Sequence, residues 1–140
     1  MKHLLSMLWI SFLIPTLAQS ADAHPVETGI KVTQILKATK QWDGSLLPPY
    51  PLNNPEITIL QYEIAPGTKL PMHKHPVINA GMMLEGELTV NAEDGKQLIL
   101  KAGDTIVELV DKWHFGINQG TTTAKLIVFY VGEVGVPLSF

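Results

Sequence analysis

From Glu56 onward the sequence is a succession of short apolar segments, each of strand length and bounded by turn residues. Residues 56–65, 84–90 and 105–110 are β-prone, and residues 124–131 are apolar at nearly every position. The last of these predicts a central strand buried on both faces. No helix-period pattern of useful length occurs after residue 23. Short strands with this spacing are typical of sandwiches and barrels, so the sequence predicts an all-β, antiparallel β-barrel fold.

One hairpin can be registered from the sequence. A three-residue loop at residues 93–95 would pair Val90 with Leu98 and Leu88 with Leu100, placing all four apolar residues on one face. A two-residue loop would slip the register by one residue and split this set between the faces. We therefore expect the three-residue loop, with its glycine in the left-handed conformation.

Residues 1–23 have the form of a secretory signal peptide. A basic start precedes an apolar core at residues 4–17, and Ala21 and Ala23 form a small-x-small cleavage pattern. An uncleaved anchor or an amphipathic arm is the alternative. Cleavage would leave the mature chain periplasmic or secreted. Within it we expect an N-terminal outer strand and a Pro-rich loop over residues 24–55, and the barrel over residues 56–140.

Composition excludes several kinds of function. The chain has no cysteine, which rules out thiolate metal sites, disulfides and a cysteine nucleophile. It has no arginine, so the usual bidentate clamp for carboxylate or phosphate is missing. The formal charge is −3 and no basic run occurs, so nucleic acid is not an expected partner. No membrane association is expected once the signal peptide is removed.

His73 and His75 are two residues apart in a strand-like segment. Side chains at this spacing point to the same face, with Cα atoms roughly 6.5 Å apart. Two imidazoles so placed can converge on one metal ion.

The surrounding residues resemble the cupin superfamily. Its first motif is a glycine, a His-x-His pair, a glutamate and a second glycine, and this chain has Gly67, His73, His75, Asn79 and Gly86 at those positions. At the positions of its second motif this chain has Gly103, Leu109, Asp111, His114 and Asn118. The resemblance extends over residues 56–131. It implies a jelly-roll cupin barrel with one divalent ion (Fe, Zn, Cu, Mn or Ni) bound by the three histidines.

Two departures from these motifs affect the expected site. Asn79 replaces the family's glutamate ligand and would contribute a weak oxygen ligand or none. Three neutral imidazoles would leave the ion its full +2 charge and open positions, as in a catalytic site. Leu109 and Asp111 replace a proline and a glycine, which predicts a differently shaped turn. A barrel that has lost its metal is the alternative.

The expected function is that of a small-molecule metalloenzyme, dioxygenase- or isomerase-like. No general base stands out, because the interior is expected to be poor in carboxylates. The alternative is a non-catalytic periplasmic binder of a small ligand or metal. Strand parity places Gln61, Met83 and Phe129 in the substrate pocket. The ligand could be anionic, and a homodimer would cover the apolar tail at residues 134–140.

Overall fold

The computed structural model describes residues 29–140, so the predicted signal peptide lies outside the described residues. Residues Gln34–Phe140 form one compact unit. The strands are β1 (Pro55–Ile64), β2 (Ile78–Glu85), β3 (Glu87–Ala92), β4 (Gln97–Lys101), β5 (Thr105–Val107), β6 (His114–Ile117) and β7 (Ala124–Glu133). No helix long and apolar enough to cross a bilayer occurs among residues 29–140.

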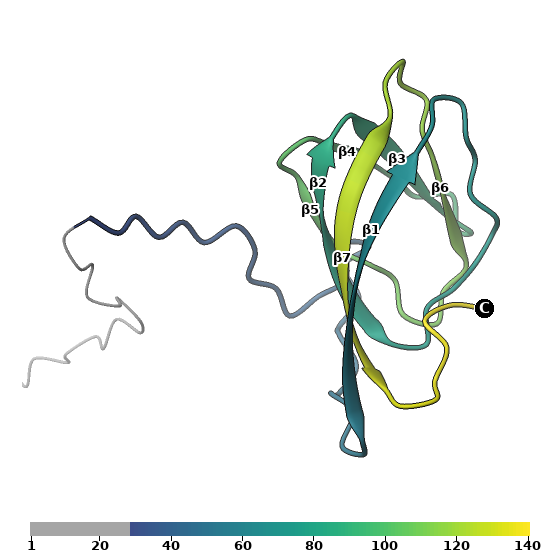
Figure 1. Cartoon of the computed structure of the whole chain (residues 1–140). Coiled ribbons are helices and arrows are strands. Elements are labelled where there is room, and N and C mark those ends of the chain that lie inside the picture. The colour runs from purple at the N-terminus through teal and green to yellow at the C-terminus, as the bar shows by residue number, and fades with distance from the viewer. Residues whose placement is uncertain (1–28) are drawn as a thin grey trace, which may run out of the picture. The chain divides into compact units, whose positions relative to one another are not determined.

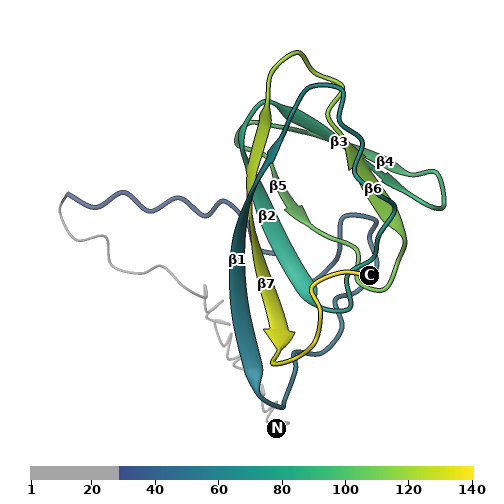
Figure 2. The same cartoon turned by 45° about the vertical axis from the view of Figure 1, so that its right-hand side comes forward.

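The strands form two sheets that face each other (Figures 1 and 2). One sheet has the order β1-β7-β2-β5 and the other has the order β4-β3-β6, and all pairings within them are antiparallel. The predicted all-β, antiparallel fold is confirmed. Side chains on the inner faces, among them Leu88, Leu100, Met83 and Val128, are almost fully buried and make the core.

The β3–β4 hairpin has the predicted register. Val90 pairs with Leu98 and Leu88 pairs with Leu100. Gly95 closes the loop with a φ of 86° and donates its backbone N–H to the carbonyl of Ala92 at 3.0 Å. The hydrophobic pattern therefore did specify the register, because any slip would have exposed half of the apolar set.

Strand β7 is central, as predicted, but it is not buried on both faces. Its residues alternate between buried and partly exposed, and Phe129 is 46% exposed. Its outer side belongs to an apolar sheet face that also carries the exposed Ile57 and Ile59 of β1. An apolar residue on the outer face follows the same sequence pattern as one in the core, so the run of apolar letters could not separate the two.

The N-terminal outer strand expected within residues 24–55 is not observed among residues 29–54, which the structure describes. Within residues 29–54 the only pairing is an isolated bridge between Lys40 and Leu46. Ile30, Val32 and Ile35 are exposed, so these side chains contribute no burial that would hold a strand in place. The barrel itself begins at Pro55, one residue before the predicted boundary.

Candidate metal centre

Two of the three predicted histidine ligands are fixed to each other through the backbone. His73 and His114 exchange a pair of N–H···O bonds of 2.9 Å each. His75 lies two residues along the same segment, and its carbonyl accepts a 2.8 Å hydrogen bond from the N–H of Asp111. The ring centroids are 4.6–5.1 Å apart, so the imidazoles form a compact triangle.

Each imidazole is held by a backbone carbonyl that accepts a 2.8 Å hydrogen bond from its Nδ1–H. The carbonyl belongs to Pro71 for His73, to Lys112 for His114 and to Leu138 for His75. In a neutral ring this leaves Nε2 without a proton and free to bind a metal. Two of these anchors are local, whereas the Leu138 carbonyl comes from residue 138, 63 positions away.

Residues 134–140 form a closing segment that folds back over the site. Lys74 and Phe140 exchange two backbone hydrogen bonds of 3.0 and 3.3 Å, next to the Leu138 carbonyl that orients His75. Leu138 packs against the core, and Ser139 and Phe140 line the cavity described below. Part of the apolar tail that was predicted to be covered by a homodimer partner therefore packs against its own barrel.

Glu108 completes the group, and the sequence interpretation missed it. Its Oε2 lies 2.8 Å from Nε2 of His75 and 3.2 Å from Nε2 of His114. The ligand atoms of Glu108 and the three histidines all lie within 4.8 Å of one another. The expectation of an interior poor in carboxylates is thus wrong at the metal-binding group, where Glu108 lies beside the histidines.

The carboxylate and the imidazoles shift each other's protonation. Burial alone would raise the pKa of Glu108, but hydrogen bonds from His114 and His75 outweigh burial and lower the pKa to about 2. Burial lowers the pKa of His75, yet the bond to Glu108 reverses this and the pKa is raised. The pKa of His73 is lowered by burial and by the two neighbouring imidazoles. Glu108 therefore favours a proton on Nε2 of His75, the nitrogen that a metal would take.

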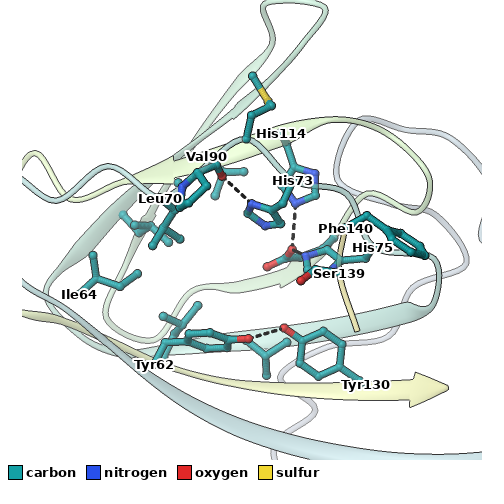
Figure 3. Close-up of a pocket in the computed structure, with 17 residues that line it drawn as sticks. Tyr62, Ile64, Leu70, His73, His75, Val90, His114, Tyr130, Ser139 and Phe140 are labelled. Carbon is teal, nitrogen blue, oxygen red and sulfur yellow. Dashed lines mark hydrogen bonds and ion pairs between the residues drawn. The ribbon is translucent and has the colours of Figure 1, made fainter. Parts of the chain in front are cut away.

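The metal-binding group lies at one end of a cavity of about 360 Å³ (Figure 3). The walls are mostly aliphatic, formed by Ile64, Leu70, Leu88, Val90, Leu126 and Val128. The hydroxyls of Tyr62 and Tyr130 meet at 2.8 Å on the opposite side from His73 and His114. Burial and the bond to Tyr62 raise the pKa of Tyr130, so its phenol stays protonated.

The cupin domain profile matches residues 60–130, half of the sequence. This chain belongs to the cupin domain family. The match includes both motifs and all three histidines, as the resemblance of the sequence predicted.

Curated relatives are similar over most of this cupin. Oxalate oxidase 1 from Hordeum vulgare is 29% identical, with 91% of this chain and 65% of that protein aligned. Germin-like protein 3-5 from Oryza sativa subsp. japonica is 29% identical over 88% of this chain and 56% of that protein. The chain thus spans less than two thirds of the length of these relatives.

Solved structures share the fold. A DMSP lyase, DddQ, from Ruegeria pomeroyi DSS-3 superposes with a TM-score of 0.54 at 18% identity, covering 60% of this chain and 42% of that one. The oxalate decarboxylase of Lactobacillus farciminis, solved as a formate complex, also gives a TM-score of 0.54 at 19% identity. It covers 60% of this chain and 26% of that one.

Glu108 lies across a strand pairing from Asn79. Ala80 of β2 pairs with Val107 of β5, and the N–H of Glu108 donates to the carbonyl of Asn79 at 3.2 Å. One step further along this register, Asn79 and Glu108 are opposite each other. Side chains of opposed residues have Cβ atoms about 4.5–5.5 Å apart and lie on the same face. Glu108 therefore brings a carboxylate to the region that the family's motif glutamate would serve.

Asn79 itself is fully buried, and neither its amide nitrogen nor its amide oxygen has a hydrogen-bond partner in the protein. It is not among the residues that line the cavity. The structure thus places Asn79 beside the site without a hydrogen bond to any of the histidines.

The turn at the second motif retains a feature that a glycine would supply. Asp111, at the glycine position, adopts a φ of 55°, in the left-handed region. Aspartate tolerates this region better than most residues because its short side chain can bond locally. The backbone of Asp111 thus adopts the left-handed conformation that glycine favours.

The three pocket residues predicted from strand parity do not line this cavity. Gln61 and Phe129 are exposed on the outer face of their sheet. Met83 does point inward and is 1% exposed, but it is core. The inward residues of β1 are Tyr62 and the residues two positions away from it. The prediction for Gln61 was therefore wrong by one residue, because neighbouring residues of a strand point to opposite faces of the sheet.

A divalent ion fits the residues that are present. Three Nε2 atoms and one carboxylate form a mixed nitrogen and oxygen donor set, which suits Mn, Fe, Zn, Cu or Ni. The carbonyl anchors fix the metal-binding tautomer of each ring in advance. The group also opens onto a cavity, which leaves room for a ligand to reach the ion.

Proposed function

We propose that this cupin is a metalloenzyme that binds one divalent ion through His73, His75, His114 and Glu108 and acts on a small molecule. The observation that carries this proposal is the convergence of these four side chains at one end of an aliphatic cavity. A structural metal site would be closed by its ligands, whereas this one faces a volume within the usual range for ligands. The proposal assigns the carboxylate to Glu108 in preference to Asn79.

In this function the residues around the site would have separate roles. The bound ion supplies Lewis acidity toward a coordinated oxygen atom. The carbonyls of Pro71, Lys112 and Leu138 keep the rings oriented, and the aliphatic walls exclude water from the ligand. Tyr130 remains a neutral phenol and so can donate a hydrogen bond. A dioxygenase- or isomerase-like reaction fits a site of this kind, in which a bound ion would polarise a coordinated oxygen atom.

The test begins with metal content and calorimetric metal titration of the wild type, His75→Ala and His114→Ala. Glu93→Gln serves as the control, because it removes a carboxylate from an exposed loop. We expect one ion per wild-type chain and severe loss of affinity in both histidine variants. Equal affinity in all four proteins would refute the proposal. An oxygen-uptake and product screen on the loaded protein should start with oxalate, because the relatives include proteins named oxalate oxidases.

The second candidate is a non-catalytic binder of a small ligand or metal. It is favoured by the full engagement of Glu108 with the histidines, which leaves no separate acid–base pair around the cavity in the described part of the chain. A tightly held ion without turnover on any substrate of the screen would select this function.

Export is proposed on the basis of the apolar core at residues 4–17 and the Ala21-x-Ala23 pattern. The mature protein would then be periplasmic or secreted, beginning at His24. N-terminal sequencing of protein recovered from outside the cytoplasm tests this. An intact Met1 in a cytoplasmic fraction would contradict it.

A further inference from the structure

The polar groups of the cavity are confined to few places. The metal-binding group forms one end, Tyr62 and Tyr130 form a second polar point, and Ser139 lies in the closing segment. The remaining lining residues are apolar, and no lysine, asparagine or glutamine lines the cavity in the part of the chain that the structure describes. The chain has no arginine at all.

The lysines near the site are engaged elsewhere. The ammonium group of Lys74 lies 3.7 Å from the carboxylate of Asp111. That of Lys69 lies 4.0 Å from the centre of the Phe115 ring, and that of Lys112 pairs with Asp43. None of the three lines the cavity, so none supplies a positive charge to a ligand bound inside it.

The formal charge of the loaded site limits the charge of its ligand. Three neutral imidazoles and the Glu108 carboxylate reduce a divalent ion to a net charge of +1. A monoanion would bring this total to zero. A dianion would leave one negative charge among aliphatic side chains with no cation in the wall, and an uncompensated buried charge is strongly unfavourable.

The tyrosine pair offers one donor to a ligand. Two hydroxyls carry two protons, and one of these is used in the 2.8 Å bond between Tyr62 and Tyr130. The second proton can be donated to an acceptor oxygen in the cavity. If either tyrosine loses its hydroxyl, the other one can still donate a hydrogen bond to the ligand. Removing a single hydroxyl therefore leaves the ligand with a donor.

Resting on the proposed metal function, we propose that the ligand is a small monoanion with a chelating oxygen head and an aliphatic body, such as a branched 2-oxo or 2-hydroxy monocarboxylic acid. Its head would bind the ion, its body would lie against Leu88, Val90 and Val128, and an oxygen would accept from the tyrosine pair. Oxalate, a dianion without an apolar body, matches this cavity less well, although relatives of this cupin carry its name.

The test measures binding and needs no turnover. Manganese-loaded full-length protein is titrated with 4-methyl-2-oxopentanoate, pyruvate and oxalate, using calorimetry and the electron paramagnetic resonance spectrum of the ion. Metal content is measured afterwards to detect removal of the ion by oxalate. We expect 4-methyl-2-oxopentanoate to bind at least about tenfold more tightly than pyruvate, because three more carbons become buried. It should also bind more tightly than oxalate.

The tyrosine pair is tested with the same titration. Tyr62→Phe/Tyr130→Phe should weaken binding of 4-methyl-2-oxopentanoate by about fivefold to tenfold, the effect of one neutral hydrogen bond. Each single variant should lose less, and Tyr50→Phe, which alters an exposed tyrosine, should lose nothing.

The outcomes separate the two proposals. If the loaded protein binds oxalate more tightly than 4-methyl-2-oxopentanoate, or binds none of the three acids, the ligand class is overturned and the metal site stands. If the double tyrosine variant binds like the wild type, the role of the pair is overturned. If no manganese or other divalent ion is retained before any acid is added, the proposed function itself fails.

Discussion

Replacing Glu108 with glutamine tests whether Glu108 is the carboxylate ligand of this site. The change keeps the shape of the side chain and removes its charge. Partners that only orient a metal ligand are worth 10–100-fold in affinity, so a direct ligand should be worth at least about 100-fold. At 1.4 kcal/mol per tenfold, that is about 2.8 kcal/mol of binding free energy.

The geometry allows a rescue experiment. Asn79 lies opposite Glu108 across the β2–β5 pairing, so exchanging the two residues returns a carboxylate to the same face. We expect Glu108→Asn/Asn79→Glu to bind metal at least about tenfold more tightly than Glu108→Asn alone. A tenfold gain in affinity requires the restored carboxylate to recover only about 1.4 kcal/mol of the binding free energy lost with Glu108. Asn79→Ala should leave metal affinity nearly unchanged, because Asn79 does not line the cavity and makes no hydrogen bond to the histidines.

The assay is calorimetric metal titration, with thermal unfolding followed by circular dichroism to confirm that each variant is folded. Glu93→Gln is the surface control. The reasoning is refuted if folded Glu108→Gln binds metal like the wild type. It is also refuted if the exchanged variant is folded and binds no better than Glu108→Asn.

Three further predictions follow from the structure. Metal affinity should fall as pH decreases between about pH 8 and pH 5, starting above the ordinary imidazole pKa of about 6.5. The reason is that Glu108 raises the pKa of His75, and the extra proton competes with the ion for Nε2. In Glu108→Gln, the fall in metal affinity should begin at a lower pH than in the wild type. An unchanged pH of onset would contradict the effect assigned to Glu108. Gly95→Val should destabilise the fold by about 1 kcal/mol or more, because a β-branched residue resists positive φ and nothing lies within 4 Å of the added Cβ to compensate. Urea unfolding measures this, and an unchanged midpoint would refute it. Light scattering should show a homodimer, because Ile57, Ile59 and Phe129 leave an apolar sheet face exposed. Only monomer at high concentration would count against it, and Ile59→Lys should weaken the association.

The sequence predicted those parts of the site whose positions are set by local spacing. His73 and His75 share a face because they are two residues apart in an extended segment, in which each forms a β-bridge, and the second motif supplied His114. The β3–β4 register followed because only one pairing buries all four apolar residues. For the histidine pair and for the hairpin the physical constraint acts within a short stretch of chain, whereas His114 was predicted only from the resemblance to the family motif.

The missed residues depend on pairing between distant strands. Glu108 faces inward with Ile106, its neighbour in strand parity, and a charged residue within this apolar segment was the available signal. Its meaning appears only when β5 is placed beside β2, which no local pattern specifies. Gln61 and Phe129 were misplaced for a related reason, because parity without a known reference residue leaves the two faces of a strand interchangeable.

The carbonyl of Leu138 that orients His75 also sets the order in which the site can be assembled. During synthesis, His73 and His75 emerge before residue 138, so a chain without its closing segment lacks the carbonyl that orients His75. We therefore expect a chain without this segment to bind metal more weakly than the complete fold. Loading with metal should come after folding, and the ion that this cupin acquires should be selected by the compartment in which the closing segment docks.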